Sequence, residues 1–292
     1  MWRFLLFLCG MLKLATNRLC ISLHQPGDGF YRGTRFDAAG VFDGITFRGR
    51  EICDRWFENY DPYMHDAVCG PAEEFSPIFM DGGILKIGVG LLGHLDGPYD
   101  RFKLYPVLDA GSRSLEARPD SVLFGHKLEG YYEYFKEIVL TGEDSFQISH
   151  ELTPRVPLQT DVYNHNFFTL GKLQVGESRR LRFPFSPECT WRAQYDSVGL
   201  VPHGLQFSRT LDKGESVYSG DIHQQGSEGL PYEFTLCEGG LKVQVSADVP
   251  ALRMVFWANH RIACPEPYNS INAAPGETLR WTVSYRILED ES

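Results

Sequence analysis

The sequence lacks the features that mark several large classes of protein. No segment reaches the roughly 18 consecutive apolar residues that a transmembrane helix needs. Basic residues are in the minority: 28 Lys and Arg stand against 38 Asp and Glu, so the formal net charge is −10. Nucleic-acid binders need clustered Lys and Arg to neutralise phosphates. We therefore expect neither a membrane-spanning protein nor a nucleic-acid partner.

Short catalytic and metal-binding motifs are also absent. The chain has no GxSxG, no phosphate-binding loop, and no HxH or HExxH among its nine histidines. These absences argue against an α/β-hydrolase, a nucleotide-binding enzyme and the common zinc enzymes. We expect no metal ion and no cofactor.

Seven cysteines are present, but none forms a CxxC pair. Their number is odd and their spacing is wide: Cys9, Cys20, Cys53, Cys69, Cys189, Cys237 and Cys264. A chain of this length does not need disulfides to build a core. The pattern predicts scattered reduced thiols and a cytoplasmic protein.

The N-terminus leaves a second location open. Residues 1–11 carry one Arg and an apolar run from Phe4 to Cys9, which is similar to a short signal peptide. No clean small-x-small cleavage site follows, so an extended start, with Met11 as the true one, is the alternative. We therefore separate residues 1–13 from a single domain over residues 14–292, and secretion or a periplasmic location stays open.

What the sequence does contain is a β pattern. Residues 279–287 alternate apolar and polar side chains, as a half-buried antiparallel strand does. Residues 132–140 do the same, and a turn at 141–144 leads into a return strand from Phe146. The 29 Gly and 17 Pro are spread between such segments, and no long amphipathic helix is evident. We expect an all-β fold, a large antiparallel β-sandwich.

Two local features are expected to interrupt the strands. Asp43-Gly44 has the composition of a turn. Residues 54–77 are rich in Asp, Glu, Tyr and Pro, which predicts a long loop across one face, and such loops are often functional.

The densest polar and aromatic cluster lies at residues 160–171. On a strand, alternation places Tyr163, His165 and Phe167 on one face and Asn164 and Asn166 on the other. An imidazole among aromatic rings suits a sugar, whose C–H face packs on rings. A histidine satisfied in the core is the alternative.

The same cluster resembles a known family. Residues 164–171 are similar to the Asn-His-x-Tyr/Phe-Phe-Asn-Leu-Ala-Gly stretch of the galactose mutarotase, or aldose 1-epimerase, family. Residues 263–268 resemble that family's Cys-Leu-Glu-Pro-Gln segment, and residues 31–40 resemble a variant found in divergent members. The likeness covers roughly residues 14–288. It implies a galactose mutarotase-like β-supersandwich.

The resemblance also implies a reaction: an isomerase that interconverts sugar anomers without a cofactor. A base removes the C1 hydroxyl proton while an acid protonates the ring oxygen, so the ring opens and recloses. An unperturbed His pKa near 6.5 suits the acid, and a Glu near 4.3 suits the base. By resemblance, His165 is the acid and Glu266 is the base.

The resemblance further implies residues that contact the sugar. Arg35 is favoured over its neighbour Arg32, because positions three apart on a strand face opposite ways. The expected set of sugar contacts is Arg35, Arg32, His65, Glu73, Glu74, Tyr163 and Asn164. A pair of guanidinium groups would suit a phosphorylated or uronic sugar.

Three functions remain open at this stage. The first is an aldose 1-epimerase-like enzyme acting on a monosaccharide or modified sugar. The second is a non-catalytic carbohydrate-binding protein with the same fold. The third, a lyase or glycosidase accessory domain, needs further catalytic groups that the sequence does not supply. The sugar and the oligomeric state are left open.

Overall fold

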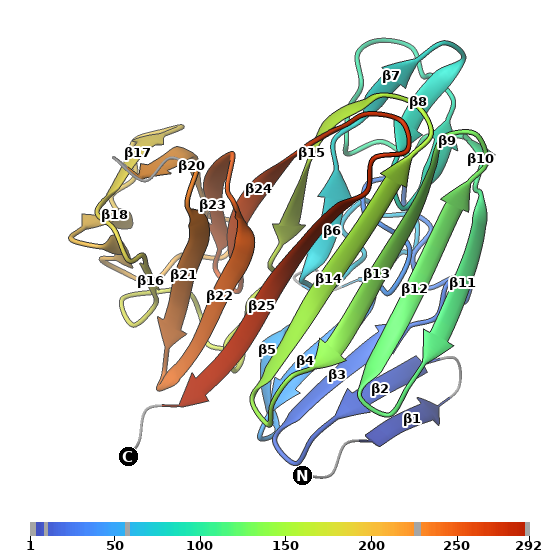
Figure 1. The fold of residues 1–292 in the computed structure, drawn as a ribbon. Helices are drawn as coiled ribbons and strands as arrows, with labels where there is room; N and C mark the ends of the chain where they lie inside the picture. Colours follow the sequence, from blue (N-terminus) through green and yellow to red (C-terminus); the bar gives the residue numbers. More distant parts are fainter. Residues whose placement is uncertain (1–3, 9–10, 56–58, 225–228, 290–292) are drawn as a thin grey trace.

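A computed structural model describes residues 4–8, 11–55, 59–224 and 229–289. Within these ranges the chain forms 25 strands and no helix (Figure 1). No helix long and apolar enough to cross a membrane therefore occurs among them. The cysteines in these ranges are all unbridged, whereas Cys9 lies outside them.

One layer of the molecule is a ten-stranded antiparallel sheet. Along β25 (Leu279–Glu289), Trp281, Val283 and Tyr285 are buried and alternate with more exposed residues, as the sequence predicted. The other strands, in spatial order around β25, are β11 (Ser112–Ala117), β12 (Ser121–Leu128), β13 (Tyr132–Leu140), β14 (Ser145–Pro154), then β22 (Leu241–Pro250), β21 (Pro231–Glu238), β16 (Arg180–Arg182), β19 (Gly204–Phe207) and β18 (Val198–Val201).

The facing layer consists of two smaller sheets. Phe168 links them through isolated bridges to Cys53 and Ala263. The six-stranded sheet has the order β17 (Pro187–Trp191), β20 (Ser216–Gln224), β23 (Arg253–Asn259), β24 (Ala263–Ala273), β15 (Leu158–His165) and β6 (Ala72–Phe75). The five-stranded sheet has the order β1 (Phe4–Leu8), β2 (Met11–Ala15), β3 (Leu19–His24), β4 (Phe42–Phe47) and β5 (Arg50–Cys53).

A small four-stranded sheet stands at one end of the molecule, at the top in Figure 1. Its order is β10 (Val107–Asp109), β9 (Gly90–Leu92), β8 (Gly83–Lys86) and β7 (Ile78–Met80). It has its own apolar cluster of Ile84, Val89, Leu92 and Tyr105. The long segment between β9 and β10 reaches from this sheet toward the six-stranded sheet, and it contributes to the site described below.

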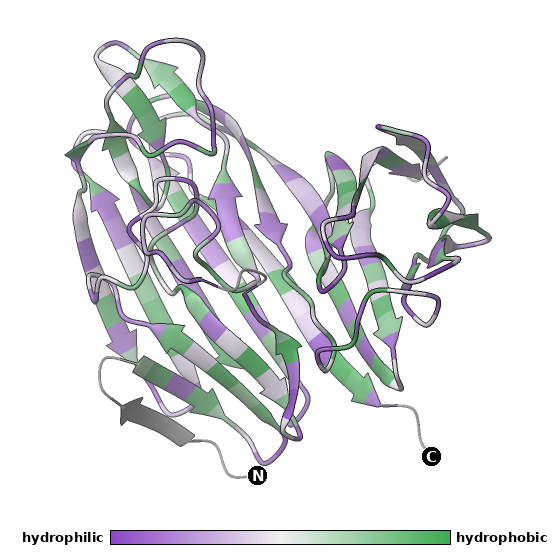
Figure 2. Cartoon of the chain, turned by 180° about the vertical axis from the view of Figure 1, so that it is seen from behind, coloured by the Kyte–Doolittle hydropathy of each residue, from purple (hydrophilic) through white to green (hydrophobic). Residues whose placement is uncertain are grey.

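The core lies between the two layers. Green and purple bands alternate along the strands in Figure 2, which is the period of two that buries one face of each sheet. Phe75 of β6 packs edge-on against Tyr134 and Trp281 of the ten-stranded sheet. The predicted all-β antiparallel sandwich is confirmed, and so is the hairpin in which Leu140 pairs with Phe146.

One local prediction was wrong and another was right only in part. Asp43-Gly44 lies inside β4 rather than at a turn, and the loop expected over residues 54–77 is interrupted by β6. β6 escaped the pattern because two of its four residues are glutamates, yet all four are buried. A buried carboxylate needs ionic partners that only the folded chain provides.

The N-terminal segment joins the domain. β2 pairs with β3 along its whole length, and Leu12 and Leu14 are fully buried in the core. The sheet thus runs across the boundary that we expected between residues 13 and 14. Residues 1–3 and 9–10, which belong to the signal-like stretch, lie outside the described ranges.

Candidate active site

The register of β15 and β24 brings the two family-like motifs together. Tyr163 pairs with Tyr268 in the antiparallel ladder. Two residues further on, on the same face, His165 and Glu266 come opposite each other, with His165 Nε2 3.4 Å from Glu266 Oε1. The two groups are thus in contact rather than separated by the width of a sugar ring. Because the two oxygens of a hemiacetal share one carbon, adjacent acid and base groups can still reach both.

Both side chains lie in a large pocket on the exposed face of the six-stranded sheet. The cavity has a volume of about 1170 Å³, which exceeds what a monosaccharide needs. Its lining comprises Arg35, His65, Asp66, Pro77, Phe79, Pro98, Tyr99, Asp100, Arg101, Phe102, Lys103, His165, Arg192, Tyr218, Arg253, Trp257, Glu266 and Tyr268. The sheet supplies the floor, and the segments around His65 and Arg101 supply the walls.

Burial sets the charge of the central pair. It raises the pKa of Glu266 to about 8, and it lowers the pKa of His165 to about 3, with the Arg35 charge adding to the effect on His165. Near neutral pH the pair therefore holds one proton, on the carboxyl group. The unperturbed pKa values suggested the opposite distribution, because they take no account of burial.

Arg35 is the centre of a buried ionic network beside the pair. Its Nε donates to Glu74 Oε2 at 2.6 Å, its Nη2 donates to the Tyr163 hydroxyl at 2.9 Å, and its Nη1 contacts Asp66. Burial alone would raise the pKa of Glu74, but Lys86 and Arg35 lower it to about 2. The network holds Arg35 rigidly at the pocket wall.

His65 also lies at the wall. Its Nε2 is 3.1 Å from Asp66 Oδ2, and its ring packs edge-on against Phe102, with 4.9 Å between the ring centroids. Asp66 thus connects His65 to Arg35. Burial would raise the pKa of Asp66, but its hydrogen bond with His65 and the Arg35 charge hold it below the usual range.

Glu73 and Glu74 are adjacent on β6 and therefore face opposite ways. Glu74 pairs in register with Tyr163 and reaches the Arg35 network below the pocket surface. Glu73 pairs with Asn164 and faces the interior, where its carboxylate is 3.0 Å from Lys136 Nζ. Neither glutamate lines the pocket.

Asn164, Tyr163 and Arg32 do not line the pocket either. The Asn164 amide donates to Glu73 Oε1 at 3.3 Å on the interior face. Tyr163 is buried beneath Tyr268, stacked with a centroid separation of 4.3 Å. Arg32 is on the surface and donates to the Tyr63 hydroxyl. Of the expected sugar contacts, Arg35 and His65 lie in the pocket with His165 and Glu266.

Sequence reasoning missed several lining residues. Tyr268 lies two positions from Glu266 on β24 and therefore faces the same side of the sheet. Arg253 and Trp257 face that side from the neighbouring strand β23. Alternation along the two strands could therefore have indicated all three residues. Asp66, Arg101 and Arg192 come from irregular segments, and no sequence periodicity places them.

No group of three or more His, Cys, Asp and Glu is arranged to hold a metal ion anywhere in the described ranges. The pocket lining itself offers proton-carrying side chains, cations and aromatic rings.

The fold is that of known solved structures. A galactose mutarotase-like protein from Clostridium acetobutylicum matches with a TM-score of 0.58 at 12% identity, covering 99% of both chains. A galactose mutarotase-related enzyme from Lactobacillus acidophilus matches with a TM-score of 0.57 at 11% identity, covering 96% of this chain and 97% of the other. An aldose epimerase homologue from C. elegans matches with a TM-score of 0.55 at 12% identity, covering 97% and 99%.

No family model and no curated protein sequence matches the chain. The structural matches define the class: the chain has the galactose mutarotase-like fold. At such low sequence identities, these structural matches establish the fold alone.

Proposed function

We propose that this protein is an aldose 1-epimerase-like isomerase that interconverts the anomers of a monosaccharide. The observation that carries the proposal is the contact between His165 and Glu266 on the floor of a sugar-sized or larger pocket. The pair holds a single proton that can pass to the ring oxygen while the C1 hydroxyl proton returns to the other member. Ring opening and reclosure leave the proton count of the pair unchanged.

The direction of proton flow follows from the charge of the pair. In the free pocket the proton is on Glu266. The family-like assignment, with His165 as the acid, requires a bound sugar to move that proton across the 3.4 Å gap to Nε2. Alternatively, Glu266 protonates the ring oxygen and His165 accepts the hydroxyl proton. Both routes need the same two residues.

Binding is proposed to use the aromatic and polar lining. Trp257 presents ring surface beside the pair, and rings suit the C–H face of a sugar. His65 and Arg35 are placed to orient hydroxyl groups from the wall. Because Tyr163 stacks on Tyr268 and the Arg253 guanidinium lies over the Tyr268 ring, we assign the stacking role to Trp257 instead.

Anomer exchange measured by NMR, on hexoses, uronic acids and sugar phosphates, tests the proposal. We expect wild type to accelerate exchange of at least one sugar, and Glu266→Gln to remove about 10²–10⁴-fold of the rate while sugar affinity changes little. His165→Asn should act in the same way. Lys127→Gln, at an exposed salt bridge on the ten-stranded sheet, is the matched control.

The competing function is a carbohydrate-binding protein without catalysis. It predicts that a sugar binds, that its anomers exchange no faster than in buffer, and that Glu266→Gln has no kinetic effect. That combination of results would contradict the isomerase proposal.

A further inference from the structure

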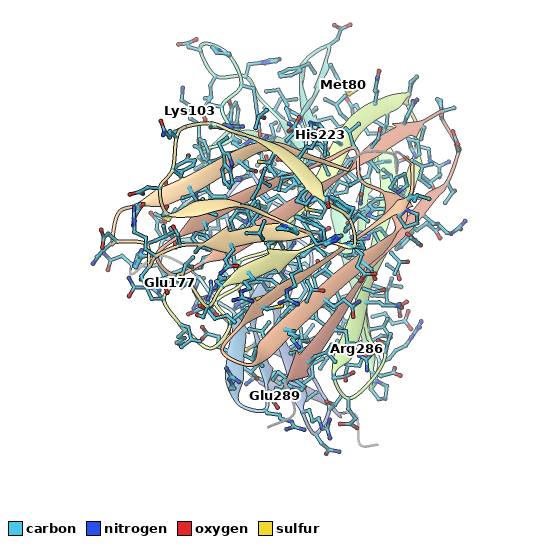
Figure 3. All side chains as sticks on the ribbon, turned by 90° about the vertical axis from the view of Figure 1, so that its left-hand side faces the viewer. Met80, Lys103, Glu177, His223, Arg286 and Glu289 are labelled. Atoms are coloured by element: carbon cyan, nitrogen blue, oxygen red, sulfur yellow. The ribbon has the colours of Figure 1, made fainter. Side chains whose placement is uncertain are left out.

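The pocket is cationic although the protein is acidic. The chain has a formal net charge of −10, yet five lining side chains are basic: Arg35, Arg101, Lys103, Arg192 and Arg253. In Figure 3, Lys103 lies toward the same end of the molecule as Met80, away from Arg286 and Glu289. Arg101 and Lys103 come from the β9–β10 segment, Arg253 from β23, Arg35 from the segment between β3 and β4, and Arg192 from the segment after β17.

The carboxylates of the pocket do not balance these five cations. Asp66 is paired with Arg35 and His65, and Asp100 accepts from the Phe102 backbone N–H at 3.0 Å. Glu266, whose pKa is raised to about 8, is protonated and uncharged near neutral pH. Within the described ranges, no ion pair engages Arg192 or Lys103. A pocket with surplus positive charge favours an anionic ligand.

Two arginines are held in place for such a ligand. Arg253 Cζ lies 4.2 Å from the Tyr268 ring centroid, and Arg101 Nη1 donates to the Tyr163 hydroxyl at 3.1 Å. Since Tyr163 and Tyr268 stack on each other, the two guanidinium groups flank one aromatic pair. Stacking occupies the face of the Arg253 guanidinium and leaves its N–H edge for bidentate contact with an oxyanion.

A nearby carboxylate competes with a ligand for each of these two arginines. Arg253 is 3.6 Å from Asp221, and both side chains are more than a third exposed, so the pair is weak. Arg101 is 3.5 Å from the buried carboxylate of Glu74, which also serves Arg35 and Lys86. Arg35 also pairs with Asp66, so these three cations face two carboxylates and positive charge remains at this end of the pocket.

The strand register gives the distance of this end from the reacting pair. Tyr268 lies two residues beyond Glu266 on the same face of β24, which is roughly 7 Å. Arg253 pairs with Tyr268 in register. A sugar whose anomeric carbon lies at Glu266 would therefore present its far end, about one ring away, to Arg253 and Arg101.

We propose that the substrate is an anionic monosaccharide whose phosphate monoester or carboxylate, at the end distal to the anomeric carbon, is bound by Arg253 and Arg101. This inference rests on the proposed epimerase function and specifies its substrate class. Arg192 and Lys103 add long-range attraction at the rim of the pocket.

Calorimetric binding of a hexose, its 6-phosphate, its 1-phosphate and the corresponding uronate tests the inference separately from catalysis. We expect the 6-phosphate or the uronate to bind about tenfold or more tightly than the hexose, the usual size for a hydrogen bond to a charged group. The stronger of the two identifies the anion. The 1-phosphate should bind more weakly than the 6-phosphate, because its charge would lie at the neutral His165–Glu266 pair.

Substitution locates the anion. Arg253→Gln should weaken binding of the anionic sugar about tenfold and leave hexose affinity within twofold. Arg101→Gln should do the same, and if that variant does not fold, Arg253→Gln alone decides. Arg155→Gln, at an exposed ion pair outside the pocket, is the matched control.

Two outcomes would overturn the inference: equal affinity for the hexose and both anionic sugars, or an Arg253→Gln effect that is the same for charged and neutral sugars. A preference for the 1-phosphate would also overturn it, since the anion would then lie at the reacting end. Tight, Arg253-dependent binding of an anionic sugar without anomer exchange supports the anion site and rejects the epimerase function.

Discussion

At the scale of single residues, burial decides the chemistry of the site. Glu266 and His165 are both nearly inaccessible, and removal of water disfavours the charged form of each. The pair consequently carries one proton over a wide pH range. In a pair with one proton, the protonated member can act as the acid and the other member as the base.

The first prediction concerns pH. Above a pH of about 8 the pair loses its proton from Glu266, so no acid remains to protonate the ring oxygen, and catalysed anomer exchange should fall. The rate should be level between about pH 5 and 7, after subtraction of the buffer rate. Glu266→Gln should have no alkaline limb of this kind. A catalysed rate that climbs steadily through pH 9 would show that the pair is not the proton source.

The second prediction concerns Asp66, a positioning residue between His65 and Arg35. Asp66→Asn keeps the size of the side chain but removes the charge that holds both partners. We expect KM to rise about tenfold and kcat to change by less than threefold, because hydrogen bonds to charged groups are worth about 1.5–3 kcal/mol. Steady-state kinetics give both constants. Asp61→Asn, at an exposed turn, should change neither, and a loss confined to kcat would instead place Asp66 in the proton transfer.

At the scale of elements, the alignment of β15 with β24 creates the site. Asn166 follows the end of β15 and is fully buried. Its amide donates to the Pro265 carbonyl at 2.8 Å, next to Glu266, and its carbonyl oxygen accepts from the Tyr285 hydroxyl at 3.2 Å. Asn166 therefore ties His165 and Glu266 to each other and to the opposite layer.

The third prediction tests that tie. Asn166→Ala leaves the Pro265 carbonyl and the Tyr285 hydroxyl without this partner, which should lower the free energy of unfolding by about 1–3 kcal/mol. The catalytic rate should fall more than sugar affinity, because misalignment of reacting groups is costly. Urea unfolding and anomer exchange on the same samples separate the two effects. Asn17→Ala, at an exposed turn, serves as the control, and an unchanged rate in a destabilised Asn166 variant would reject the positioning role.

At the scale of the whole molecule, charge is buried between and beside the layers. Lys136 of β13 reaches from the ten-stranded sheet to Glu73 of β6 and to Asp37, with its Nζ 3.0 and 2.7 Å from the two carboxylates. Burial alone would raise the pKa of Glu73, but the Lys136 charge lowers it to about 2. Removing one partner of a buried ion pair lowers the free energy of unfolding by about 3–5 kcal/mol.

The fourth prediction follows from these depressed pKa values. Glu73 and Glu74 titrate near 2 in the folded chain and near 4.5 when exposed, so their stabilisation is complete above about pH 4.5 and is lost as the pH falls toward 2. Urea unfolding at a series of pH values should show this slope. Glu73→Gln should be less stable at pH 7 and have a shallower acid slope. Glu116→Gln, at a surface pair, should leave the slope unchanged; a slope equally steep in Glu73→Gln would remove Glu73 as its source.

The sequence by itself determined the all-β class, the antiparallel hairpins and the identity of the two motifs. Alternation is a local property, so the buried face of β25 and the common face of Tyr163 and His165 could be predicted from it. The pairing of His165 with Glu266 rested on the resemblance, because nothing local connects β15 with β24.

Only the tertiary structure decided which polar residues reach the pocket. Glu73 and Glu74 are neighbours in a polar segment, and the register of β6 against β15 sends one to the interior and the other to Arg35. The wall residues Asp66 and Arg101 come from irregular segments whose positions depend on long-range packing. The tertiary structure also decided which member of the His165–Glu266 pair carries the proton, since burial moves the pKa values of both groups far from those of the free side chains.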